Sequence, residues 1–229
     1  MENLPSYISI IFGLTTLLTV WIFYKATHTS KITLMVLLLW LLIQAVVTRT
    51  GFYTVTDTLP PRFMLLVFPA LLLIVILFIT VKGRQYIDSL DVKILTLLHT
   101  VRIPVELVLL WLSVHKVIPE LMTFEGRNFD ILSGITAPLI YYFGFIKKQL
   151  SDQIILIWNF ICLALLFNIV INAVLSVPFR FQQFAFDQPN IAVLYFPFSW
   201  LPCCVVPLVL FSHLVSIRQL LKRRGELYS

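Results

Sequence analysis

Charged residues are scarce in this 229-residue chain: Asp, Glu, Lys and Arg make up 12% of it, against 59% hydrophobic residues. Soluble domains carry about 25% charged and about 45–50% apolar residues, so the composition excludes an ordinary soluble domain. Seven helices of about 20 residues, the length that crosses a bilayer, would use about 140 residues. The sequence therefore predicts a single integral membrane domain over residues 1–229, with only loops outside the lipid.

Cysteine and histidine are also few, and their spacing matches no metal or redox motif. The three cysteines, Cys162, Cys203 and Cys204, lie in apolar segments without a CxxC pair, so no disulfide framework is indicated. The four histidines form no HxxxH or HExxH pair, and the sequence contains no nucleophile elbow, Walker loop or dinucleotide fingerprint. We expect no metal site and no cofactor, and no motif indicates an enzyme.

Hydrophobic runs long enough to cross a bilayer take up most of the chain. A backbone in lipid must satisfy its own hydrogen bonds, and barrel strands would be shorter and alternate in polarity, so we expect helices. The fold class is all-α, a polytopic membrane protein. The first span is expected to be retained, because no basic region precedes it. The seven expected spans are 5–24, 31–50, 63–81, 91–114, 130–146, 153–177 and 190–216.

Basic residues are distributed unevenly between the two sides of this arrangement. Eleven fall on one side: Lys25, Lys31, Lys82, Arg84, Lys93, Lys147, Lys148, Arg218, Lys222, Arg223 and Arg224. Five fall on the other: Arg49, Arg62, Lys116, Arg127 and Arg180. Because cytoplasmic loops collect Lys and Arg, we expect the N-terminus outside, the C-terminus inside and a location in the cytoplasmic (plasma) membrane. The net charge of +6 then indicates contact of the C-terminal tail with anionic headgroups, and not with nucleic acid.

A weak internal repeat connects the second and third spans with the sixth and seventh. A shift of 128 residues places IQAVVT (43–48) over INAVLS (171–176), and seven of 27 positions are identical up to Pro69 over Pro197. Biased composition inflates such matches, so chance is the alternative. A real duplication would give a 3+1+3 arrangement of parallel repeats, with a site at their interface. That arrangement is similar to the one in SWEET-type sugar transporters, although no sequence motif of that family is present.

The fourth span carries the polar residues that are most costly in a bilayer. His99, Arg102 and Glu106 share one helix face, because about 100° per residue brings Glu106 within about 20° of His99. An arginine or carboxylate inside a span costs about 2.5–3.5 kcal/mol and normally has a partner. The i,i+4 spacing lets Arg102 pair with Glu106. His99 is the histidine expected at central depth, whereas His28 and His213 are expected near the cytoplasmic face.

A ligand pocket around this face is the main functional expectation. Pro104 removes a backbone donor and loosens the helix, and broken helices at mid-membrane depth recur at transport sites. In the sixth span Asn168 and Asn172 share a face, whereas Asn159 points the opposite way. We expect an outward-facing pocket lined by Arg102, Glu106, His99, Asn168, Asn172 and Gln44. The alternative is a buried ion pair that only locks helix packing.

The polar loop after this span ends in FEGRNFD, residues 124–130. Its glycine and flanking phenylalanines favour a folded lid over the pocket, formed by Glu125, Arg127, Asn128 and Asp130. Asp130 would also cap the next helix. Solvated charges without contact to the pocket are the alternative.

Three functions fit this sequence. The leading hypothesis is a membrane protein that binds or transports a small solute, with Arg102 holding an anionic group or keeping Glu106 ionised, and Glu106 carrying a proton. The first alternative is a membrane-embedded enzyme for a lipid or other apolar substrate, with Glu106 and His99 as acid–base groups. The second is a membrane scaffold subunit without a small-molecule site. The sequence identifies neither a substrate nor an oligomeric state.

Overall fold

The computed structural model describes residues 4–227, without the side chains of residues 224–227. The side chain of Arg224, part of the expected basic tail, therefore lies outside the described residues. The α-helices are α1 (Ser6–Ala26), α2 (Lys31–Arg49), α3 (Met64–Ile79), α4 (Val81–Ser89), α5 (Val92–Leu98), α6 (Arg102–Val114), α7 (Ile131–Ile140), α8 (Asp152–Leu175) and α9 (Val206–Leu227). Short 3₁₀-helices lie between them: η1 (Phe52–Thr54), η2 (His99–Val101), η3 (Glu120–Met122) and η5 (Ala192–Leu194). Two π-helical segments continue the α-helices: η4 (Tyr141–Ile146) follows α7, and η6 (Leu201–Val205) precedes α9.

The described part of the chain is all-α, and five of its helical segments are long and apolar enough to cross a membrane. These segments are Ser6–Ala26, Lys31–Arg49, Val92–Val114, Asp152–Leu175 and Leu201–Arg223. The bent pair of α3 and α4 would make a sixth span, and Ile131–Ile146 is apolar but shorter. These helices are compatible with an integral membrane protein, as the composition predicts.

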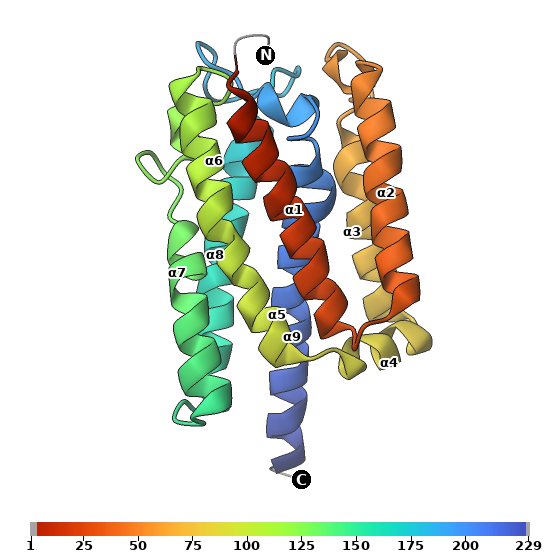
Figure 1. The fold of residues 1–229 in the computed structure, drawn as a ribbon, viewed down its shortest axis with the longest axis vertical. Helices are drawn as coiled ribbons and strands as arrows, with labels where there is room; N and C mark the ends of the chain where they lie inside the picture. The colour runs from red at the N-terminus through yellow and green to blue at the C-terminus, as the bar shows by residue number, and fades with distance from the viewer. Residues whose placement is uncertain (1–3, 228–229) are drawn as a thin grey trace.

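The long helices run side by side along the longest axis of the molecule (Figure 1). α1 packs against α5 and α6, and α9 packs against α5 and α8. α2 and α3 form a hairpin at one side of this bundle, and the start of α1 and the end of α9 lie at opposite ends (Figure 1). α7 begins near the middle of the long axis, so the loop before it runs part of the way down the side of the bundle (Figure 1), where Asn128 and Asp130 are buried.

The third expected span, 63–81, is shorter in the structure because the chain bends by 95° between α3 and α4. Thr80 is extended, and its Oγ1 accepts a hydrogen bond from the Gly83 amide at 3.1 Å, which caps α4. A Cβ on Gly83 would collide with the backbone of Leu77. The polar helix α4 is held across the bundle end by Asp88, whose carboxylate lies 2.9 Å from Arg218 in α9.

The last helix begins and ends later than the expected range of 190–216. The chain forms η5 and several turns before the π-turn η6, and α9 then continues to Leu227. Pro197 explains the late start, since proline lacks an amide donor and disfavours a helical residue before it. Pro202 and Pro207 lie inside the helical segment Leu201–Arg223.

Helix α2 is fastened to this irregular segment by side-chain hydrogen bonds. Pro207 cannot donate to the carbonyl of Cys203 four residues earlier, and the Trp40 indole donates to that carbonyl instead at 2.9 Å. The Trp200 indole donates to the Leu41 carbonyl at 3.1 Å. The Thr48 hydroxyl donates to Ser199 Oγ at 2.9 Å. These three bonds all involve the part of α2 from residue 40 onward.

Candidate functional site

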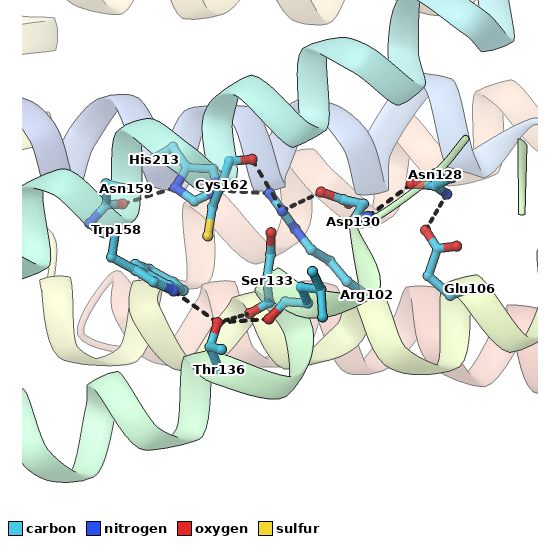
Figure 2. Close-up of polar contacts among 11 residues, drawn as sticks. Arg102, Glu106, Asn128, Asp130, Ser133, Thr136, Trp158, Asn159, Cys162 and His213 are labelled. Atoms are coloured by element: carbon cyan, nitrogen blue, oxygen red, sulfur yellow. Dashed lines mark hydrogen bonds and ion pairs between the residues drawn. The ribbon is translucent and has the colours of Figure 1, made fainter. Parts of the chain in front are cut away.

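Arg102 is the centre of a buried polar cluster that joins α6, α8, α9 and the loop before α7 (Figure 2). The residue is 3% exposed. Its Nη1 donates to Asp130 Oδ1 at 2.6 Å and to the Cys162 carbonyl at 3.4 Å. Its Nη2 lies 2.7 Å from His213 Nε2. The guanidinium therefore bonds to three other segments of the chain at once.

The carboxylate that pairs with Arg102 is Asp130, and not Glu106 as the i,i+4 spacing suggested. Arg102 is the first residue of α6, and helical side chains point back toward the helix N-terminus. Glu106 lies one turn further along the helix, where its Oε1 bonds to Asn128 (Figure 2). The two acidic groups thus have separate partners: Asp130 pairs with Arg102 of α6, and Glu106 pairs with Asn128 of the polar loop.

The protonation of His213 follows from its two partners. A guanidinium can only donate hydrogen bonds, so Nε2 of His213 accepts the bond from Arg102. Nδ1 lies 2.9 Å from Asn159 Oδ1, and the amide nitrogen of Asn159 donates to the Ile155 carbonyl at 2.9 Å. Asn159 therefore accepts from Nδ1, and His213 is the neutral tautomer with its proton on Nδ1.

His99 packs against His213, although the sequence placed only His99 at central depth. The two rings stack with their centroids 3.9 Å apart and their planes 17° apart, and Trp158 packs edge-on at 5.6 Å. The expected position of His213 near the cytoplasmic face is wrong, because the last span begins at Leu201 and places residue 213 near its middle. Both ring nitrogens of His99 are buried and lack a hydrogen-bond partner among the described residues.

Asn128 fixes the polar loop inside the bundle. Its amide nitrogen donates to Glu106 Oε1 at 2.6 Å and to the Met122 carbonyl at 3.0 Å, while its Oδ1 accepts from the Asp130 amide at 3.0 Å. Asn128 and Asp130 are buried, whereas Glu125 and Arg127 are exposed. Of the four expected lid residues, two therefore contact the cluster and two face outward.

The other expected pocket residues bond outside this cluster. Asn168 is exposed and donates to the Arg127 carbonyl at 2.8 Å, and the Asn172 amide lies 3.3 Å from Asn168 Oδ1. Gln44 accepts from the Tyr53 hydroxyl at 2.7 Å, and burial raises the pKa of that hydroxyl to about 12. The structure brings together His99, Arg102 and Glu106, and it leaves the three amides with other partners.

Sequence reasoning missed His213 and Asn159 as members of the cluster. Asn159 was set aside because it faces away from Asn168, yet that opposite face is the one that packs against α9. The available signal was a polar residue on each of two neighbouring helices, Asn159 on α8 and His213 on α9, which predicts a hydrogen bond between them if they lie at the same depth. It could be used only once the depth of the last helix was known.

The cluster is closed to solvent in this structure. His99 is 0%, Arg102 3% and Glu106 2% exposed. Within the described part of the chain, no group of three or more His, Cys, Asp or Glu residues is arranged to hold a metal ion. The arrangement can neutralise charge and hold or transfer a proton.

Comparison with known proteins places this chain in a family without giving it a function. Neither the curated proteins nor the solved structures contain a match to the chain. Residues 59–221 match the family model described as Domain of unknown function (DUF8737). This match spans more than half of the chain and contains His99, Arg102, Glu106, Asp130 and His213. The chain therefore belongs to the DUF8737 family.

Proposed function

We propose that the protein binds or transports a small solute at the Arg102 cluster, and that Glu106 carries a cation or a proton there. The charge balance of the cluster is the observation that carries this proposal. Arg102 is already paired with Asp130 at 2.6 Å, and the bonds of His213 keep it neutral. An ionised Glu106 would add a second negative charge in a dry site, where a charge requires a partner.

The unpartnered polar atoms of the cluster support the same proposal. Arg102 Nε, Glu106 Oε2 and both His99 nitrogens are buried without a hydrogen-bond partner in the described structure. Native proteins pair nearly all such groups with protein, water or ligand. Four unpartnered atoms on one helix face are consistent with a place where a small polar solute or ion binds.

The proposed membrane arrangement has seven spans, with Ile131–Ile146 as the short fifth one, in a 3+1+3 repeat. The N-terminus lies outside and the C-terminus inside a plasma membrane, as the distribution of basic residues favours. The loop of residues 124–130 then closes the cluster from the outer side, and breaking the bond between Asn128 and Glu106 opens it. With the bond between Asn128 and Glu106 formed, as in this structure, the proposed site is occluded.

A thermal-shift screen with charge-matched variants tests the proposal. Purified protein is titrated with sodium, potassium, ammonium, small organic amines, sugars and organic acids at constant ionic strength. We expect a saturable rise in Tm for wild type and for Glu125→Gln, and none for Glu106→Gln. Glu125 is the control because it is an exposed glutamate close to the cluster in sequence.

An equal Tm response in all three proteins would show that the Glu106 carboxylate is not needed for binding of the solute or cation. No response in any of them, together with a Glu106→Gln variant at least as stable as wild type, would favour the scaffold function. In that case the cluster only fixes the packing of the helices.

A further inference from the structure

A cavity of about 380 Å³ lies between α2, α3 and the last span, apart from the Arg102 cluster. This volume is within the range of about 300–1,000 Å³ that small-molecule sites usually have. The lining is almost entirely apolar. Its walls include Ile32, Val36, Trp40, Leu73, Leu208 and Phe211.

Along the cavity, two side-chain hydrogen bonds connect α2 to its neighbours, one at Trp40 and one at Thr33. Toward the C-terminal half of α2, the Trp40 indole donates to the Cys203 carbonyl at 2.9 Å. Near the start of α2, the Thr33 hydroxyl lies 3.3 Å from the Tyr86 hydroxyl of α4. The turn of α2 between these contacts carries Val36 and Leu37, both of which line the cavity.

The mouth of the cavity is apolar and exposed. Ile32 is 73%, Val36 50% and Leu73 51% exposed, and these three residues lie on α2 and α3. In a helix pair that crosses a bilayer, such side chains face hydrocarbon, so an occupant enters sideways from the lipid. The chemistry that complements these walls is a hydrocarbon chain, because binding removes apolar surface on both sides.

The polar end of the cavity carries positive charge. Thr33 and Tyr86 are the hydroxyl-bearing residues of the lining. Lys31, at the first position of α2, and Lys82, one turn before Tyr86 in α4, are both exposed. The nearby carboxylate of Asp88 is already paired with Arg218 at 2.9 Å. Clusters of lysine at a membrane surface attract anionic headgroups.

We propose that this cavity binds one acyl chain of an anionic phospholipid, whose phosphate lies against Lys31 and Lys82. The chain enters between α2 and α3 and packs against Trp40 and Leu208. The Thr33 and Tyr86 hydroxyls lie at the level of the glycerol esters. This lipid site is separate from the solute site around Arg102, so each can be tested without the other.

Photochemical labelling in nanodiscs tests the lipid site. The protein is reconstituted in phosphatidylcholine with a trace of phosphatidylglycerol that carries a photoactivatable group in one acyl chain, and the labelled residues are mapped by mass spectrometry. We expect label on the inner walls, at Trp40, Leu37 and Leu208. Lipid that only surrounds the protein would label the exposed faces of α2 and α3 instead.

Two cavity-filling variants and one matched control make the result specific. Ala70→Phe and Val36→Trp enlarge side chains that line the cavity and should reduce inner-wall labelling severalfold. Leu38→Trp is the control, since Leu38 is a similarly exposed residue of α2 that does not line this cavity. Using both filling variants keeps the test valid if one of them fails to fold.

The headgroup is tested by the double variant Lys31→Gln/Lys82→Gln. Competition with unlabelled phosphatidylglycerol should be severalfold stronger than with phosphatidylcholine in wild type, and equal for both lipids in the variant. Inner-wall labelling that survives both cavity-filling variants would overturn the proposal. Unlabelled inner walls in a protein that purifies as a dimer would also overturn it, because a second copy would then occupy the groove.

Discussion

At the scale of single residues, the structure reassigns the ion pair of the cluster. The guanidinium of Arg102 and the carboxylate of Asp130 are both buried, 2.6 Å apart. Removing one partner of such a pair leaves an uncompensated buried charge, which is far more costly than removing both. This asymmetry provides a test of which carboxylate balances Arg102.

Arg102→Met alone should destabilise the protein by about 3–5 kcal/mol, because Asp130 loses its partner. Adding Asp130→Leu should recover most of this loss, whereas adding Glu106→Met should not, since the charge of Asp130 stays buried. Denaturant unfolding in detergent, followed by tryptophan fluorescence, measures all three variants. If Glu106→Met is the change that restores stability, Glu106 is the true partner of Arg102.

At the scale of helices, the sequence predicts the ends of several long apolar spans well. The expected spans 31–50, 91–114 and 153–177 coincide within about two residues with Lys31–Arg49, Val92–Val114 and Asp152–Leu175. A run of about 20 apolar residues sets both the length and the depth of such a helix. His99 and Arg102 were expected to lie inside the protein for the same reason, because polar groups within a span are costly and need partners, and both are buried.

The last span could not be placed from the sequence, whereas the expected span 130–146, which contains Pro138, lies within one residue of Ile131–Ile146. The last span was expected to begin at residue 190, but the structure begins its long helical segment at Leu201, so His213 lies near the middle of that segment. The 95° bend before α4 depends on Thr80 and Gly83. Asp130 reaches Arg102 only because the loop folds into the bundle, a contact over 28 positions that no local pattern specifies.

One of the hydrogen bonds that attach α2 comes from the Trp40 indole at the proline break. Trp40→Phe removes the donor to the Cys203 carbonyl, which Pro207 leaves without a helical partner. We expect a loss of about 0.5–1.5 kcal/mol in stability and faster amide hydrogen exchange in α2, with no change in α8. Trp21→Phe is the control, because that indole is 54% exposed on α1. Unchanged exchange in α2 after Trp40→Phe would mean that this bond does not hold the helix.

At the scale of the whole molecule, the first helices belong to the same core as the matched family region. Phe12 packs against Phe198 with ring centroids 5.3 Å apart, and Phe23 packs against Phe211 at 6.0 Å. Helices α1 and α2 precede the family match over residues 59–221, yet they form part of the bundle and one wall of the lipid cavity. The bundle is therefore one unit, and its path through the bilayer depends mainly on whether the short segment Ile131–Ile146 crosses.

Labelling of introduced cysteines tests that path. The three native cysteines, Cys162, Cys203 and Cys204, are buried and should give little background labelling. Lys116 and Lys148 are exposed on either side of the short segment. We expect a membrane-impermeant maleimide to label Lys116→Cys in intact cells, and Lys148→Cys only after permeabilisation. The reverse pattern would invert the proposed orientation. Labelling of both in intact cells would mean that the short segment turns back within the membrane, and the protein would then have an even number of spans.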